Sequence, residues 1–242
     1  MKELIYVIGI GPGGIDEITP RAIESLKNCD AVVGYTRYVE LLREELAGKI
    51  VRTSGMRQER ERCEEALSLA QDAKTVAVIS SGDSGVYGMA GLMLEVAQGS
   101  GQEVRVIPGI TAANSCAAVL GAPLMNDYVT ISLSDILTDW STIERRLIAA
   151  CEGDFVICSY NPASNHRPEH FRRACEILLR HKSPQTPAGY VRNISREGQE
   201  HEVLTLVEIA TRKIDMLCTV IIGNSQSYIL DGKIITPRGY KA

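Results

Sequence analysis

The sequence predicts an α/β fold with two α/β domains, the first built on a mainly parallel sheet and the second on a mixed sheet. In the first half, short apolar runs alternate with amphipathic helical segments, a pattern typical of parallel sheets. In the second half several strands follow one another closely, which indicates a mixed sheet. A segment rich in helix-ending residues at 120–125 marks the boundary, so we expect domains at 1–120 and 121–242, with the ligand cleft between them.

The first half contains regularly spaced apolar segments. Thr19 is the expected cap of the first helix, with Pro20 at its first position. We expect strands at 4–8, 31–33, 50–51, 75–79 and 103–107, and helices from 20, at 37–46, at 59–71 and at 90–97.

The second half is less regular. We expect strands at 128–133, 154–158, 188–191, 202–206, 219–222 and 228–230, and helices at 142–150 and 168–181. Asp231 and Gly232 form a turn pair of the kind that closes a hairpin after the last of these strands.

Three glycine-bearing turns follow strands of the first half, at residues 9–14, 82–88 and 108–113. Ligands bind beyond the carboxyl ends of the strands in open parallel sheets, so we expect these turns to converge at one sheet edge. Asp83 then lies on the floor of a crevice beside backbone N–H groups. The alternative is that Asp83 only caps the helix after it.

The first turn formally satisfies the dinucleotide pattern G-x-G-x-x-G, but three features argue against that function. Pro12 lacks an N–H and interrupts the row of donors that would hold a pyrophosphate. The helix begins several residues after the last glycine. Tyr35 ends the second strand where a ribose-binding acid should stand, and the missing acid also counts against the common Rossmann-type methyltransferase.

Composition excludes several classes of function. The net charge of −4 argues against a general binder of nucleic acid or of anionic membranes. No apolar run approaches the roughly 20 residues of a membrane span. A strand expected within a few residues of Met1 leaves no room for a signal peptide. The seven scattered cysteines, with no C-x-x-C pair, indicate reduced cytoplasmic thiols rather than disulfides or a zinc site.

The three turns carry the motifs Val7-Ile8-Gly9-Ile10-Gly11-Pro12-Gly13, Ser81-Gly82-Asp83 with Val86 and Tyr87, and Pro108-Gly109-Ile110-Thr111-Ala112. Together these motifs resemble those of the tetrapyrrole methyltransferases of corrin and siroheme synthesis. Further segments are similar to the branch of this family that methylates C-17 in cobalamin synthesis: 53–56, 59–63, 88–92, 121–125, 132–135, 160–162 and 236–240. The substrate of that branch is precorrin-3B or cobalt-factor III, and the sequence leaves both open.

The resemblance implies a homodimer that uses S-adenosylmethionine, methylates C-17 and contracts the macrocycle by excising C-20. It places Gly82, Asp83 and Val86 on the methionine and ribose side, and Thr111 and Ala112 at the methionine carboxylate. Residues of the second domain contact the adenine. The full set of implied cofactor residues is Gly11, Pro12, Gly82, Asp83, Val86, Tyr87, Thr111, Ala112, Tyr160, Asn161, Ala188, Gly189 and Tyr190.

Ring contraction requires a proton transfer, and Asp135 and His166 are the candidates for acid or base catalysis, with a structural role as the alternative for each. Methyl transfer itself needs no side-chain nucleophile, because the sulfonium methyl is already activated. His166 and His170 are four residues apart, but no third ligand stands near them, so no metal site is expected.

The carboxylates of a tetrapyrrole call for arginines, and Arg57 and Arg60 are the expected substrate contacts. Glutamates interleave with this basic cluster, so we expect Arg62 to lie on a solvated, salt-bridged helix face. The branch should carry a basic residue directly after Asn-Pro. Ala163 stands there instead, and Arg167 follows later, which weakens a carboxylate contact from this loop.

Three alternatives stay open on the sequence alone. The chain could be another S-adenosylmethionine-dependent precorrin methyltransferase, an NAD-binding oxidoreductase that uses the first glycine turn, or a corrinoid carrier without catalytic activity.

Overall fold

The computed structural model describes residues 4–72 and 74–240, and it divides into two compact units, Met1–Ala112 and Ala113–Ala242. The division lies at the start of helix α5 (Ala112–Leu120), whereas the sequence places the boundary at its end. Packing explains the difference, because the Cys116 thiol donates to the carbonyl of Thr219 and Leu120 packs beside Gly189, both in the second unit. The cleft expected between the domains stays a prediction.

The first unit contains one parallel sheet, as the sequence predicts. Its strand order is β3-β2-β4-β1-β5, and all four strand pairs are parallel. The strands are β1 (Leu4–Gly9), β2 (Ala31–Tyr35), β3 (Ile50–Ser54), β4 (Thr75–Ser80) and β5 (Glu103–Ile107).

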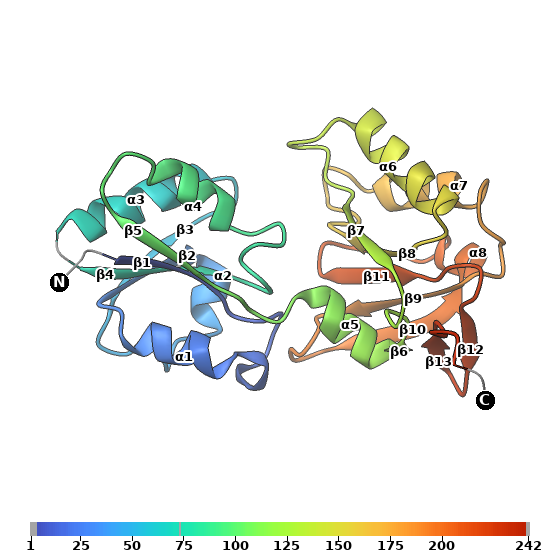
Figure 1. Ribbon diagram of the computed structural model, residues 1–242, viewed down its shortest axis with the longest axis horizontal. Helices are drawn as coiled ribbons and strands as arrows, with labels where there is room; N and C mark the ends of the chain where they lie inside the picture. Colours follow the sequence, from blue (N-terminus) through green and yellow to red (C-terminus); the bar gives the residue numbers. More distant parts are fainter. Residues whose placement is uncertain (1–3, 73, 241–242) are drawn as a thin grey trace. The chain divides into compact units, whose positions relative to one another are not determined.

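Helices cover both faces of this sheet (Figure 1). Helices α1 (Pro20–Lys27) and α2 (Thr36–Glu40) pack on one face, and α3 (Glu59–Gln71) and α4 (Ala90–Val96) pack on the other. A short 3-10 helix, η1 (Ile15–Glu17), precedes α1. Thr19 caps α1 as predicted, since its hydroxyl accepts from the Ala22 N–H at 3.1 Å. The helix expected at 37–46 is too long: it ends at Glu40, and turns then bury Leu42 and Leu46.

The second unit contains a mixed sheet, as predicted. Its strand order is β10-β9-β11-β8-β7, in which β7 and β8 are parallel and the other pairs are antiparallel. The strands are β7 (Tyr128–Ser132), β8 (Val156–Tyr160), β9 (Pro187–Arg192), β10 (Glu200–Thr205) and β11 (Cys218–Ile222). A small sheet joins β6 (Gly121–Ala122) to the hairpin of β12 (Tyr228–Leu230) and β13 (Lys233–Ile235).

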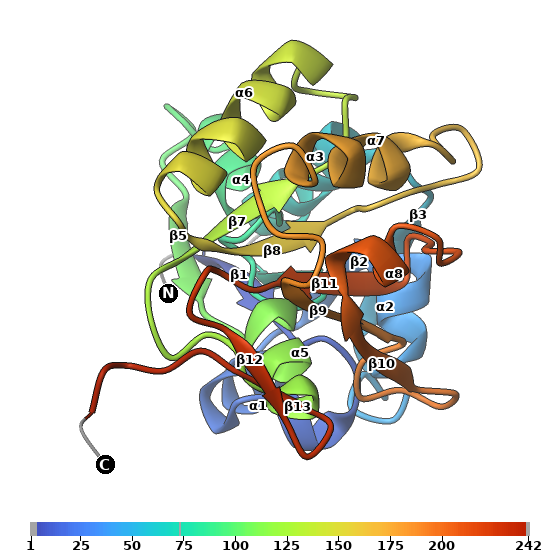
Figure 2. The same ribbon diagram turned by 90° about the vertical axis from the view of Figure 1, so that its right-hand side faces the viewer.

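The two faces of the mixed sheet are covered differently (Figure 2). Helices α6 (Trp140–Glu152) and α7 (His170–Leu178) pack on one face around a core that also includes α8 (Leu206–Ile209). Helix α5 lies on the other face, where Leu120 fills the space beside Gly189. Asp231 and Gly232 have φ of 48° and 72°, so the predicted hairpin turn is confirmed.

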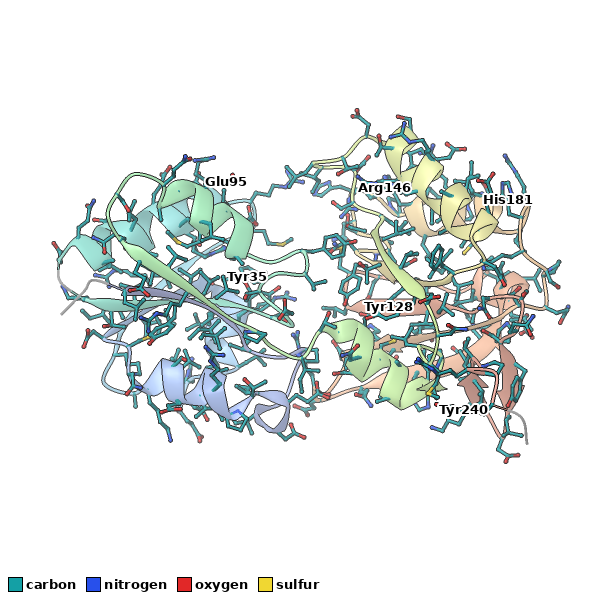
Figure 3. The ribbon with its side chains drawn as sticks, in the orientation of Figure 1. Tyr35, Glu95, Tyr128, Arg146, His181 and Tyr240 are labelled. Atoms are coloured by element: carbon teal, nitrogen blue, oxygen red, sulfur yellow. The ribbon has the colours of Figure 1, made fainter. Side chains whose placement is uncertain are left out.

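The outer sides of the helices carry charged residues. Glu95 on α4 and Arg146 on α6 are exposed examples (Figure 3). Within residues 4–72 and 74–240, no helix is both long and apolar enough to cross a membrane.

Candidate functional site

The three glycine-bearing turns of the first unit meet, as the sequence predicts. They follow β4, β1 and β5, which are neighbours in the sheet. Gly11 and Gly82 bridge the first two turns, because the Gly11 N–H donates to the Gly82 carbonyl at 3.1 Å and the Gly82 N–H donates to the Gly11 carbonyl at 2.7 Å. We call residues 9–14, 80–89 and 108–112 the turn cluster. It presents backbone groups of three loops at the carboxyl edge of one sheet, where ligands of such sheets bind.

Two positions in the turn cluster have room only for glycine. A Cβ added to Gly9 would lie 2.6 Å from the Gly109 nitrogen and 2.7 Å from the Gly82 oxygen. A Cβ on Gly109 would overlap the same Gly82 oxygen. The obstacles are backbone atoms that cannot rotate away, so the three turns owe their close approach to these glycines.

Asp83 connects two of the turns. One carboxylate oxygen accepts the N–H of Gly85 at 2.8 Å, and the other accepts the N–H of Gly109 at 2.9 Å. The alternative that Asp83 caps the following helix is wrong, because α4 begins only at Ala90 and its N-cap is Met89. The carboxylate therefore fixes the distance between the loop after β4 and the loop after β5.

The other expected cofactor residues of this unit have different environments. Gly11 and Pro12 are buried in the first turn, and Ala112 lies near Gly82, whose Cβ position is 3.7 Å from the Ala112 nitrogen. Thr111 and Val86 are half-buried. Tyr87 is 53% exposed and has a φ of 54°. The structure thus brings Gly11, Gly82, Asp83 and Ala112 together, with Tyr87 on the outer surface of its loop.

The first turn does not have dinucleotide-binding geometry. Helix α1 begins at Pro20, after η1, so the first N–H groups of the helix lie beyond the glycines rather than within the turn. Gly11, with φ of 74°, instead uses its backbone to pair with the loop after β4.

In the second unit, Tyr160 and Asn161 lie at the carboxyl ends of the parallel strands β7 and β8. The Tyr160 hydroxyl accepts the N–H of Ala113 at 2.8 Å and so holds the start of α5. The Asn161 amide donates to the Ser132 hydroxyl at 3.0 Å, and Asn161 has a left-handed φ of 50°. The parallel pairing of the two strands thus places a phenol, an amide and a hydroxyl at one edge.

The expected adenine residues on β9 present little side chain. Ala188 is fully buried in the core, and Gly189 faces Leu120. The Tyr190 hydroxyl donates to Glu202 at 2.7 Å, and Arg212 donates to the other oxygen of that carboxylate at 3.0 Å. Any ligand contact of Ala188 and Gly189 would therefore have to use their backbone.

This Tyr190–Glu202 pair gives an alkaline stability prediction. Burial and the bond to Glu202 raise the pKa of Tyr190 from 10.0 to about 12. Because the folded state then keeps the proton that the unfolded state loses, the stabilisation is complete below pH 10 and disappears between about pH 10 and pH 12. Denaturant unfolding across this pH range should show a decrease in the free energy of unfolding of the wild type, and Tyr190→Phe should not show this decrease. Parallel profiles for the two proteins would contradict the assignment.

Asp135 and His166, the two candidates for acid or base catalysis, have different surroundings. His166 is exposed and its side chain makes no hydrogen bond or ion pair among the described residues, whereas Asp135 Oδ2 lies 3.0 Å from His170 Nε2. Arg167 Nε lies 3.9 Å from Oδ1. The His170 N–H at this distance stabilises the carboxylate and lowers the pKa of Asp135. The sequence carried no pattern that links residue 135 to residues 167 and 170, which the fold brings together.

The basic cluster is also organised differently from the expectation. Arg57 and Arg60 are exposed, and their side chains make no hydrogen bond or ion pair with the described residues. Arg62 is only 5% exposed and donates to the Ser54 hydroxyl at 2.9 Å, the Gly55 carbonyl at 2.9 Å and the Met89 sulfur at 3.7 Å. The expectation of a solvated, salt-bridged Arg62 is wrong, because this side chain lies on the inward side of α3. Among the described residues, no three His, Cys, Asp or Glu side chains gather as metal ligands would.

Comparison with known proteins gives a consistent result. The family model "Tetrapyrrole (Corrin/Porphyrin) Methylases" matches residues 4–210. The chain is 49% identical over 239 residues to the "Probable cobalt-factor III C(17)-methyltransferase" of Salmonella typhimurium, covering 98% of this chain and 99% of that protein. It is 47% identical over 247 residues to the "Cobalt-factor III methyltransferase" of Priestia megaterium, and spans 46% of the length of that relative.

Solved structures agree with these matches. The structure described as the methyltransferase CobJ superimposes with a TM-score of 0.91 at 34% identity, covering 97% of this chain and 99% of that one. A cobalt precorrin-4 methyltransferase, CbiF, superimposes with a TM-score of 0.76 at 20% identity, covering 91% and 95%, a likeness that concerns the fold alone.

Proposed function

The chain belongs to the tetrapyrrole (corrin/porphyrin) methylase family, and we propose that it transfers a methyl group from S-adenosylmethionine to C-17 of cobalt-factor III or precorrin-3B, with contraction of the ring. One observation carries the proposal: the match to the Salmonella typhimurium relative extends over nearly the whole of both chains at 49% identity. A shared short motif could not give such a match.

The turn cluster supports the choice of cofactor. Small residues and backbone N–H and C=O groups line it, a chemistry that suits the compact, zwitterionic methionine part of S-adenosylmethionine. We assign two groups of residues to the cofactor. The methionine and ribose contact Gly11, Pro12, Gly82, Asp83, Val86, Tyr87, Thr111 and Ala112 in this assignment. The adenine contacts Tyr160, Asn161, Ala188, Gly189 and Tyr190. In this assignment Asp83 acts by fixing the loops through Gly85 and Gly109.

The chemistry asks the protein mainly to hold its ligands. S-adenosylmethionine, when bound, supplies a methyl group already activated on a sulfonium. The residues of the chain orient the two reactants and exclude water, which lowers the barrier without a side-chain nucleophile. For ring contraction we propose Asp135 as the group that accepts a proton, since its carboxylate is 38% exposed and charged at neutral pH.

The proposal is tested by incubating the protein with S-adenosylmethionine labelled in its methyl group and, separately, with cobalt-factor III and precorrin-3B. We expect a labelled, ring-contracted macrocycle from one of them, and calorimetry should detect binding of S-adenosylmethionine and none of NAD. A macrocycle that binds without acquiring label would identify a carrier instead. A labelled product with an intact ring, or a label at another carbon, would indicate another member of the family.

We also propose a homodimer in the cytoplasm, following the family resemblance. Sedimentation equilibrium tests the dimer directly, and a monomer at micromolar concentration would refute it.

A further inference from the structure

Helix α7 begins with a buried imidazole that faces the loop after β7. His170 is 9% exposed, and its Nε2 lies 3.0 Å from Oδ2 of Asp135. That oxygen lies off the direction of the N–H, so neither ring nitrogen has an aligned hydrogen-bond partner among the described residues. A buried imidazole with an unpartnered nitrogen calls for a functional explanation.

Nε2 is the ring nitrogen that lies 3.0 Å from the carboxylate, and an N–H on it can act as a donor toward Asp135.

His170 also packs against an aromatic side chain, which in turn lies beside a cation. Trp140 of α6 packs edge-on against the ring, with centroids 4.9 Å apart and an angle of 83°. The Arg173 guanidinium lies 4.3 Å from the centroid of the same Trp140 ring. Asp135 lies in the loop after β7, and its other carboxylate oxygen lies 3.9 Å from Nε of Arg167, which belongs to the loop before α7.

We infer that His170 is a positioning residue for Asp135, an Nε2–H donor that holds the carboxylate in place for the proton transfer of ring contraction. This inference rests on the proposed function. In the step, a bond between hydrogen and the macrocycle breaks, its electron pair stays on the macrocycle as a ring carbon migrates, and the proton forms an O–H bond on the Asp135 carboxylate, which becomes neutral and later releases the proton to water. His170 gives and receives no proton. It keeps the carboxylate oriented, and Trp140 keeps the imidazole oriented.

Three variants separate positioning from packing. His170→Gln keeps an N–H donor on a flexible chain, His170→Phe keeps the ring volume and removes the donor, and Asp135→Asn removes the proton acceptor. His181→Gln is the control, since His181 is exposed just beyond α7 (Figure 3). Single-turnover reactions are run at a series of acidic pH values. The label transferred to the macrocycle measures methyl transfer, and the mass of the product measures ring contraction.

We expect His170→Phe to slow contraction at least tenfold while methyl transfer changes less than threefold. At low pH the contraction rate falls as Asp135 becomes protonated, and we call this part of the pH–rate profile the acid limb. In His170→Phe the acid limb should move to higher pH, because the donor that lowers the pKa of Asp135 is gone. His170→Gln should restore most of the rate and the wild-type acid limb, and Asp135→Asn should not contract the ring.

Two results would overturn the inference. An unchanged acid limb in His170→Phe would show that the imidazole does not act on Asp135, and an equal loss in His170→Gln and His170→Phe would show that only ring packing matters. If the wild-type protein methylates neither macrocycle, the proposed function itself fails. If the wild-type protein methylates and contracts the ring but the variants give either of these two results, only the role of His170 is refuted and the proposed function stands.

Discussion

Gly109→Ala is expected to abolish binding of S-adenosylmethionine and to lower the free energy of unfolding by about 3 kcal/mol. The added methyl would overlap the carbonyl oxygen of Gly82 and approach the carbonyl carbon of Gly9 to 2.6 Å. Relief would require the loops after β1, β4 and β5 to separate. The N–H of Gly109 would then leave the Asp83 carboxylate, and the turn cluster would lose its shape.

Gly91→Ala provides the matched control. Gly91 lies in α4, and a Cβ there meets no atom within 4 Å. Alanine in a helix should therefore raise the free energy of unfolding by roughly 0.5–1 kcal/mol and leave the cofactor affinity unchanged. Denaturant unfolding and calorimetry measure both quantities. If the two variants bound S-adenosylmethionine equally well, the tight approach of the three turns would not matter for the site.

Asp83→Ala is expected to weaken S-adenosylmethionine binding at least tenfold, which corresponds to about 1.4 kcal/mol. The substitution leaves the N–H groups of Gly85 and Gly109 without their acceptors, so the loops after β4 and β5 lose their common attachment. Asp83→Asn should have an intermediate affinity, because its amide retains one acceptor oxygen and turns an NH₂ group toward the other N–H. Titration calorimetry gives the three dissociation constants.

Glu95→Ala is the control for the loss of one negative charge. This side chain is exposed on α4 (Figure 3) and makes no hydrogen bond or ion pair with the described residues. Glu95→Ala should bind S-adenosylmethionine with the affinity of the wild type. An unchanged affinity in Asp83→Ala would remove Asp83 from the cofactor site, and an equal decrease in Glu95→Ala would point to a general effect of charge.

The convergence of the turn cluster could be predicted from the sequence because it depends on two local signals. Apolar runs define the strands, and glycine-rich segments directly after them define the turns. Strands joined by helices run parallel, so all their carboxyl ends share an edge. Asp83 was found in the same way, since it lies in one of these turns. Its contact with Gly109 was not predicted, because the order of strands in the sheet is a property of the whole fold.

The partner of Asp135 and the burial of Arg62 could not be predicted for a related reason. His170 reaches Asp135 only because α7 packs across β8 toward the loop after β7. Arg62 follows glutamates that suggest a solvent-facing surface, yet it precedes Cys63, which is fully buried. Its guanidinium finds neutral acceptors at Ser54 and Gly55 instead of a carboxylate. Charge patterns along a helix do not reveal which loops lie above it.

The pairing of β6 with β13 has a consequence for synthesis on the ribosome. Every strand of the first unit lies within a continuous stretch of 112 residues, so that unit can acquire its native sheet while translation continues. In contrast, residues 121–122 must wait for residues 234–235 before their ladder can close. The nascent second unit therefore keeps part of its apolar surface exposed until residues 234–235 have left the ribosome, and during this interval it is open to aggregation.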